Sequence, residues 1–119
     1  MFGDGRQLRD LSYVDDVVDA FLLAALSDAG NGEVFNLGGD GPVGLAEVAA
    51  LLVRLAGQGG VALVPFPPEH KAIDIGDYYA DDRKIRSTLG WRPTTALGEG
   101  LTRTLAYYRE HRRHYWEHD

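Results

Sequence analysis

The sequence predicts a small mixed α/β domain of about four helices with a few short strands. Apolar residues recur at helical spacing in three segments: residues 14–26, 45–56 and 97–115. Asp81 can cap a fourth, shorter helix that runs to Leu89. Short runs typical of strands lie between the helices at residues 7–13, 33–37 and 61–64.

The first strand and helix follow each other closely. Residues 7–13 alternate loosely between polar and apolar side chains, as a half-buried strand does. Asp15 and Asp16 then sit in the first turn of the predicted helix 14–26, where carboxylates complement the helix dipole. Glycine and asparagine at residues 30–32 tolerate a left-handed backbone conformation and are expected to end this helix.

A strand, a glycine-rich loop and a helix are expected next. Residues 33–37 (EVFNL) are predicted as a strand, and residues 38–44 form the loop. Gly44 is the expected N-cap of helix 45–56, with Glu47 three residues later as half of a capping box.

The remaining chain is less regular. The prolines of residues 65–68 are expected to forbid regular structure after the brief strand 61–64. Residues 69–80 are predicted to be an irregular or extended loop. Gly90 closes the short helix, and an amphipathic helix over 97–115 ends in a charged turn.

Composition narrows the functional classes. The 119 residues carry a net charge of −6, which argues against a general nucleic-acid surface. Without cysteine there are no disulfides or thiolate metal sites. No apolar run approaches the roughly 18 residues of a membrane span, and no signal-peptide pattern is visible, so we expect a cytoplasmic protein.

One glycine pattern imitates a dinucleotide-binding loop. Gly38, Gly41 and Gly44 follow a predicted strand and precede a helix, which is the context such a loop requires. Pro42, however, removes a backbone donor from the loop, and Glu69 comes too late to be the usual ribose-binding acid. We therefore interpret the loop as a turn that lets a helix pack closely on a strand.

Histidines at the C-terminal end resemble a set of metal ligands. His111, His114 and His118 share one helix face and could hold zinc or nickel. Arg112 and Arg113 flank them, which favours a solvated basic terminus, and no metal ligand is predicted.

Two segments carry groups suited to an anionic ligand. Arg9 follows a glycine turn on a short strand, where a guanidinium can bind phosphate. Lys71 and Asp74 lie three apart in a loop and could hold a phosphate and a sugar hydroxyl. From these residues alone, a surface hairpin and a weak surface ion pair are the favoured explanations.

Three segments together resemble one family. They are GDGRQLRDLSYVDDVVDAFLLAAL, GEVFNLGGDGPVGLAEVAALL and IDIGDYYADDRKIRSTLGWRPTTALGEGLTRTLAYY. In order and spacing they are similar to the C-terminal part of extended short-chain dehydrogenases/reductases. These are the NAD-dependent sugar-nucleotide epimerases and dehydratases of the UDP-glucose 4-epimerase type. The resemblance implies that residues 1–119 are the sugar-nucleotide-binding domain, a small substrate-binding subdomain.

The resemblance also implies the site residues. The family's Arg-Asp-aromatic motif contacts the nucleotide diphosphate with its arginine, which falls on Arg9, and Leu11 replaces the aromatic residue. The family's Arg-x-Gly-Asp segment falls on Lys71 and Asp74, so that a lysine replaces the arginine. Lysine is a point charge and lacks the bidentate fork of arginine.

The family's catalytic parts are expected elsewhere. Its glycine-rich NAD loop and its Tyr-x-x-x-Lys pair belong to an N-terminal Rossmann half that is missing here. Ala80 stands four residues before Lys84, and Pro67 stands four before Lys71. We therefore expect no catalytic residue and no bound cofactor in this chain, and NAD only in the intact enzyme.

The expected partners are a nucleoside diphosphate sugar and the missing Rossmann half, and the resemblance allows a homodimer of the intact enzyme. The alternative is a stand-alone, non-catalytic relic or an interaction module, with the faces toward the missing half exposed as an apolar patch.

Overall fold

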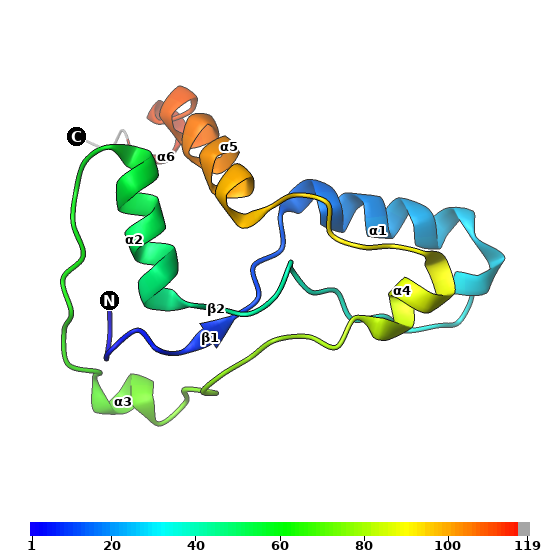
Figure 1. Ribbon diagram of the computed structural model, residues 1–119, viewed down its shortest axis with the longest axis horizontal. Helices are drawn as coiled ribbons and strands as arrows, with labels where there is room; N and C mark the ends of the chain where they lie inside the picture. The colour runs from blue at the N-terminus through cyan, green and yellow to red at the C-terminus, as the bar shows by residue number, and fades with distance from the viewer. Residues whose placement is uncertain (117–119) are drawn as a thin grey trace.

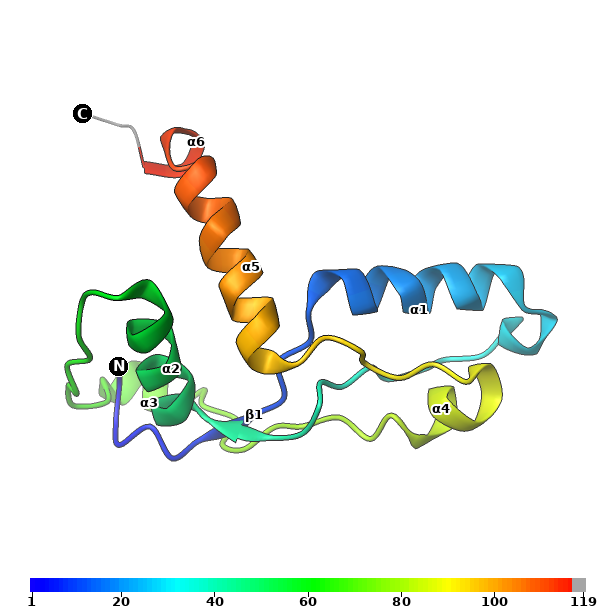
Figure 2. The ribbon, with the colours of Figure 1, turned by 45° about the horizontal axis from the view of Figure 1, so that its top comes forward.

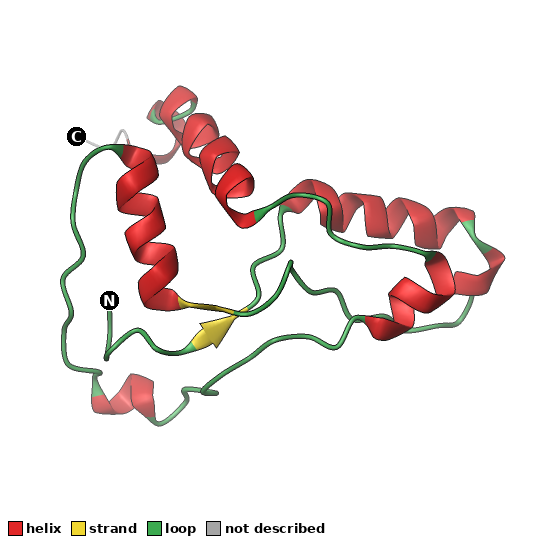
Figure 3. Cartoon of the chain, viewed as in Figure 1, coloured by secondary structure: helices red, strands yellow, loops and turns green. Residues whose placement is uncertain are grey.

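The computed structural model describes residues 1–116, which fold around a central pair of very short strands (Figures 1 and 3). The elements in order are β1 (Leu8–Arg9), α1 (Val14–Leu26), a 3-10 turn (Asp28–Gly30), β2 (Val43–Gly44), α2 (Leu45–Ala56), α3 (Pro68–Lys71), α4 (Arg83–Leu89), α5 (Leu97–Glu110) and α6 (Arg113–Trp116). The mixed fold class and the four longer helices agree with the sequence prediction.

The sheet is smaller than the sequence suggests. β1 and β2 pair antiparallel, with Leu8 opposite Gly44 and Arg9 opposite Val43. The predicted strand 33–37 is wrong, since these residues are extended but lie beside no strand among those described. The predicted strand 61–64 is reduced to one parallel bridge between Val64 and Phe2. Local β propensity cannot make a strand without a neighbour to pair with.

Two further helix predictions need correction. Pro68 begins the one-turn helix α3, because proline fits the first helical position, where its missing N–H is not needed. The predicted helix 97–115 breaks at His111, whose amide bonds back to Tyr107, and α6 follows as a separate turn. α2 begins and ends where predicted, and the amide of Gly44 donates to Glu47 at 3.3 Å. α1 begins where predicted but ends at Leu26, before the glycines that were expected to end it, and a separate 3-10 turn follows.

The buried core lies between α1 and α4. It consists of Ala20, Ile85 and Trp91, with Phe35, Leu37 and Leu89 packed against it. Asp16 in the first turn of α1 is only 2% exposed and binds the segment that leads into α5. Its carboxylate accepts hydrogen bonds from the amide and hydroxyl of Thr94 and from the amide of Thr95, at 2.8–3.2 Å.

The remaining helices stand apart from this core. Figure 2 shows α5 rising away from α1, with α2 and α3 beside the N-terminus. The radius of gyration is 17.2 Å, against the roughly 13.5 Å expected of a compact domain of this length. The exposed surface of 8682 Å² likewise exceeds the roughly 6,400 Å² expected for this mass. The chain is therefore open and leaves large faces uncovered.

None of the helices within residues 1–116 combines the length and the apolar character needed to cross a membrane.

Candidate functional site

A groove of about 540 Å³ lies at the end of the molecule that holds the N-terminus, α2 and α3. Its walls come from three segments: the N-terminal stretch that leads into β1, the start of α2, and the stretch from Phe66 to Asp77 that contains α3. The rings of Phe2 and Phe66, with centroids 5.6 Å apart, form an apolar wall, while Lys71 and Asp74 form a polar one. A concave site with both kinds of wall is typical of small-molecule binding.

The structure brings two of the sequence-predicted site residues together. The Nζ of Lys71 lies 2.6 Å from Oδ2 of Asp74 and 5.0 Å from the ring centroid of Phe66. The lysine side chain is 63% exposed, whereas that of Asp74 is only 8% exposed. Lys71 can therefore turn toward a ligand, while Asp74 is held in the wall of the groove.

Asp74 accepts two further hydrogen bonds on its other oxygen. The side-chain amide of Gln7 and the backbone amide of Gly76, at 3.2 Å, both donate to Oδ1. The hydrogen bond from Lys71, supported by those from Gln7 and Gly76, lowers the pKa of Asp74. The group is therefore a carboxylate at neutral pH, which accepts hydrogen bonds and cannot donate them.

Arg9 lies behind the groove and is not among the residues that line it. Its Nη1 donates to the carbonyls of Leu8 and Gly76, each at 2.6 Å. A guanidinium has five N–H donors, and this arrangement uses the two on Nη1. Within residues 1–116, the side-chain hydrogen bonds of Arg9 involve Nη1 alone, so the three donors on Nε and Nη2 have no acceptor in the described part of the chain.

The groove is not strongly basic. Arg6 and Lys71 line it, but so do Asp4, Asp74 and Asp77. Arg6 and Asp4 neutralise each other at the rim, 3.3 Å apart. Among the residues that line the groove, attraction of an anion therefore depends on the single ammonium of Lys71, and not on a broad positive field.

The glycine pattern at residues 38–44 has a structural role. A Cβ on Gly39 would lie 2.4 Å from the carbonyl oxygen of Leu11, and one on Gly38 would lie 2.8 Å from Asp10 Oδ2. These glycines therefore let the loop pass close to the chain that follows β1. The adjoining groove contains three carboxylates, those of Asp10, Asp40 and Asp82, and one cation, Arg86, which is already paired with Asp82. This excess of carboxylates does not suit the pyrophosphate of NAD. We find no fit for NAD at this loop.

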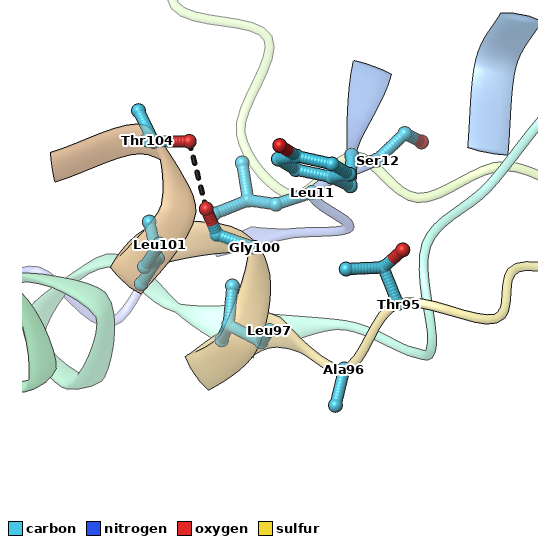
Figure 4. A pocket seen from close by; sticks show the side chains of 9 residues that line it. Leu11, Ser12, Thr95, Ala96, Leu97, Gly100, Leu101 and Thr104 are labelled. Carbon is cyan, nitrogen blue, oxygen red and sulfur yellow. Dashed lines mark hydrogen bonds between the residues drawn. The ribbon is translucent and has the colours of Figure 1, made fainter. Parts of the chain in front are cut away.

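A smaller pocket at the start of α5 is a packing seam (Figure 4). Gly100 lies against Tyr13, and a Cβ there would sit 3.0 Å from the tyrosine ring. The hydroxyl of Thr104 is already bonded to the Gly100 carbonyl at 2.8 Å. The pocket of about 70 Å³ has room for little more than water. It therefore offers no second ligand site.

The sequence analysis did not identify Gln7. A weak signal was present, because Gln7 and Arg9 are two residues apart in a run predicted as a strand, and such residues lie on one side of the strand.

Of the three histidines considered for a metal, His111 and His114 have ring centroids 6.1 Å apart. His118 lies outside the described residues.

Known proteins resemble this chain in both sequence and fold. Residues 1–38 match the model of the NAD dependent epimerase/dehydratase family. Over 112 residues, the chain is 38% identical to UDP-glucose 4-epimerase from Mycolicibacterium smegmatis, covering 92% of this chain and 34% of that protein. The chain thus spans about a third of the length of the curated relatives it matches.

Solved structures agree with this match. UDP-glucose 4-epimerase from Thermotoga maritima, solved with UDP-glucose, superimposes with a TM-score of 0.82 at 36% identity, covering 93% of this chain and 34% of that one. UDP-glucuronic acid 4-epimerase from Bacillus cereus, in complex with UDP-glucuronic acid and NAD, gives a TM-score of 0.77 at 27% identity. The match covers 92% of this chain and 34% of that one.

Proposed function

Because the chain belongs to the NAD-dependent epimerase/dehydratase family, we propose that residues 1–119 are the C-terminal, sugar-nucleotide-binding domain of such an enzyme. The ligand would be a nucleoside diphosphate sugar, bound in the groove beside α3. The observation that carries this proposal is the pairing of Lys71 with Asp74 in the wall of that groove, at the positions the family resemblance assigns.

Each group has a role that fits its geometry. Lys71 is exposed and flexible, so its ammonium would leave Asp74 or bridge to a phosphate oxygen. Arg9 would donate from Nε and Nη2 while the carbonyl of Gly76 fixes Nη1. Asp74 would accept a ribose hydroxyl, because its lowered pKa keeps it ionised. All three would bind substrate, and none would carry out the reaction.

The chemistry of the intact enzyme would be located in its other part. NAD supplies hydride transfer in enzymes that hold it, and a structure similar to this one was solved with it. The described residues of this chain offer no fit for NAD at the glycine loop. We therefore propose that this domain positions the nucleotide while an NAD-binding Rossmann half oxidises the sugar.

The uncovered faces support a protein partner. On α1, the side chains of Val14, Val18, Phe21, Leu22 and Leu26 are 47–85% exposed. Beside them Val34 is 80% exposed, in an extended segment that is free to pair with another strand. We propose that this surface packs on the Rossmann half. If the chain instead acts alone as a relic or an interaction module, the same surface would drive self-association.

Titration of the isotopically labelled chain with UDP and uridine tests nucleotide binding. We expect UDP to shift the amide resonances of Lys71 and Gly76, and uridine to shift them far less. Arg9→Ala should weaken UDP binding about tenfold, as expected for one desolvated phosphate contact. Arg92→Ala, at an exposed arginine remote from the groove, should change nothing. Equal binding of UDP and uridine, or shifts confined to other residues, would refute the proposed site.

A second experiment tests the protein partner. The chain would be co-expressed with the NAD-binding part of the M. smegmatis relative, and complex formation measured by light scattering. Phe21→Glu on α1 should abolish a complex that forms, whereas Arg54→Glu, at an exposed residue of α2, should not. Self-association of the chain, with no binding to the Rossmann part, would favour the stand-alone module.

A further inference from the structure

Gln7 and Arg9 both reach the loop that contains Asp74. Because alternate residues of an extended segment point to one side, these two side chains leave the start of β1 together. Arg9 bonds the carbonyl of Gly76, and Gln7 bonds the carboxylate of Asp74 itself. The loop is therefore held to β1 and to the residue before it by several hydrogen bonds, and the bond from Gln7 engages a functional group of the groove.

The two oxygens of Asp74 have different partners. Oδ1 accepts hydrogen bonds from the side-chain amide of Gln7 and the backbone amide of Gly76, both of which are neutral and half-buried in the wall of the groove. Oδ2 accepts only the ammonium of Lys71, which is 63% exposed. The hydrogen bonds to Oδ1 are therefore part of the folded structure. The hydrogen bond from Lys71 to Oδ2 is one that a ligand can replace.

Gln7 is itself well anchored. Its backbone carbonyl accepts the amide of Leu45, the first residue of α2, at 3.0 Å. A helix start therefore fixes the backbone from which the glutamine side chain reaches Asp74. An amide suits this position because it donates a hydrogen bond without neutralising the carboxylate, as a lysine or arginine would.

We propose that Gln7 is the positioning residue of the nucleotide site: it holds Oδ1 of Asp74, so that Oδ2 faces the groove to accept a ribose hydroxyl. The inference rests on the proposed function for the identity of the ligand. The positioning itself is a property of the free chain and can be measured without any ligand.

The test compares Gln7→Leu with Gln58→Leu, a substitution of the chain's other glutamine, which is exposed in the loop after α2. Carboxyl carbon resonances would give the pKa of Asp74, and UDP titration would give the affinity. In Gln7→Leu we expect the pKa of Asp74 to rise and the UDP dissociation constant to increase about three- to tenfold, the effect of one lost hydrogen bond. In Gln58→Leu neither should change.

The outcomes separate this inference from the proposed function. An unchanged pKa of Asp74 in Gln7→Leu overturns the positioning role, as does a raised pKa with unchanged UDP affinity. If the unmodified chain binds no UDP, the proposed function fails, and the pKa of Asp74 still decides whether Gln7 holds it. If Gln7→Leu does not fold, the side-chain amide of Gln7 in the unmodified chain gives the answer. Its nitrogen resonance should follow the titration of Asp74, and independence from that titration overturns the inference.

Discussion

Asp16 and Asp74 are both carboxylates held by three hydrogen-bond donors, but the donors differ in kind. Asp16 is 2% exposed, and its donors are the amide and hydroxyl of Thr94 and the amide of Thr95. Asp74 has two neutral donors and one ammonium on a flexible, exposed stem, that of Lys71. The donors to Asp16 are fixed by the fold and cannot move away from the carboxylate, whereas the ammonium of Lys71 can.

This difference separates a structural carboxylate from a candidate binding one. Burial by itself would raise the pKa of Asp16, but the hydrogen bonds from Thr94 and Thr95 outweigh it and lower the pKa. The indole of Trp91 adds a bond to the Asp16 carbonyl at 2.8 Å, which closes α1 onto the segment before α5. No ligand can reach this arrangement, whereas the groove beside Asp74 is open.

Asp16→Ala should give the largest effect on stability. The substitution leaves the two Thr94 donors and the Thr95 amide without their acceptor, and each unsatisfied buried donor costs about 1–3 kcal/mol. We expect the free energy of unfolding to fall by about 3 kcal/mol or more in urea denaturation followed by circular dichroism.

The neighbouring Asp15 is the matched control. Its carboxylate is 55% exposed and pairs with Arg103 at the surface, so Asp15→Ala should cost under about 1 kcal/mol. If the two substitutions have equal effects, Asp16 is not the anchor described here.

Gly39→Ala should give the next largest loss. The new methyl group would meet the carbonyl oxygen of Leu11 at 2.4 Å, and backbone cannot move aside cheaply. We expect a loss of about 1–3 kcal/mol in the same measurement. Gly60→Ala, where a Cβ meets nothing within 4 Å, should have little effect. A tolerated Gly39→Ala would contradict the structural interpretation of the glycine loop.

Acid should act on both carboxylates in the same direction. Their folded pKa values are lowered, while an unfolded aspartate titrates near pH 3.9, so the unfolded state binds protons first as pH falls. The free energy of unfolding should therefore be flat from about pH 7 to 5 and fall below about pH 4. Asp16→Asn should reduce this fall, and Asp28→Asn at an exposed turn should not. An identical pH profile in both variants would contradict the assignment to Asp16.

The local elements were predictable where their signals were local. α2 was predicted with its observed ends, because its apolar periodicity and its flanking glycines are local signals. The start of α1 was predicted likewise, but the helix ends at Leu26, before the glycines expected to stop it. The strands were not, since residues 33–37 have β propensity but no neighbouring strand within the described chain. Pairing is a property of two segments, and one segment's sequence does not contain it.

The site was predictable only in part for a similar reason. Lys71 and Asp74 are close in sequence, so their ion pair could be anticipated from it, while their binding of a phosphate and a sugar hydroxyl stays a prediction. Gln7 is 67 residues from Asp74, so its contribution appears only when β1 and the loop are brought together. Asp16 was interpreted only through the helix dipole, because its partners are 78 and 79 residues away. Hydrogen-bond partners that are far apart in sequence leave no local sequence pattern from which the bond could be predicted.

Lys71→Met should have the smallest effect on stability but should weaken UDP binding. Asp16→Ala should do the reverse. The ammonium is exposed, and Asp74 keeps the donors from Gln7 and Gly76, so the urea midpoint should hardly move. UDP affinity should fall, and its dependence on salt should weaken, because one phosphate contact is lost.

Lys84→Met is a close control, because Lys84 also pairs with a carboxylate at 2.6 Å and lies 5.3 Å from a phenyl ring, that of Phe35. It differs in lying by α4, away from the groove. If both lysine variants lose UDP affinity equally, overall charge governs binding and not the groove. If Lys71→Met unfolds the chain while affinity per folded molecule is unchanged, Lys71 is structural like Asp16. Only a stable chain with weakened UDP binding preserves the distinction between the two carboxylates.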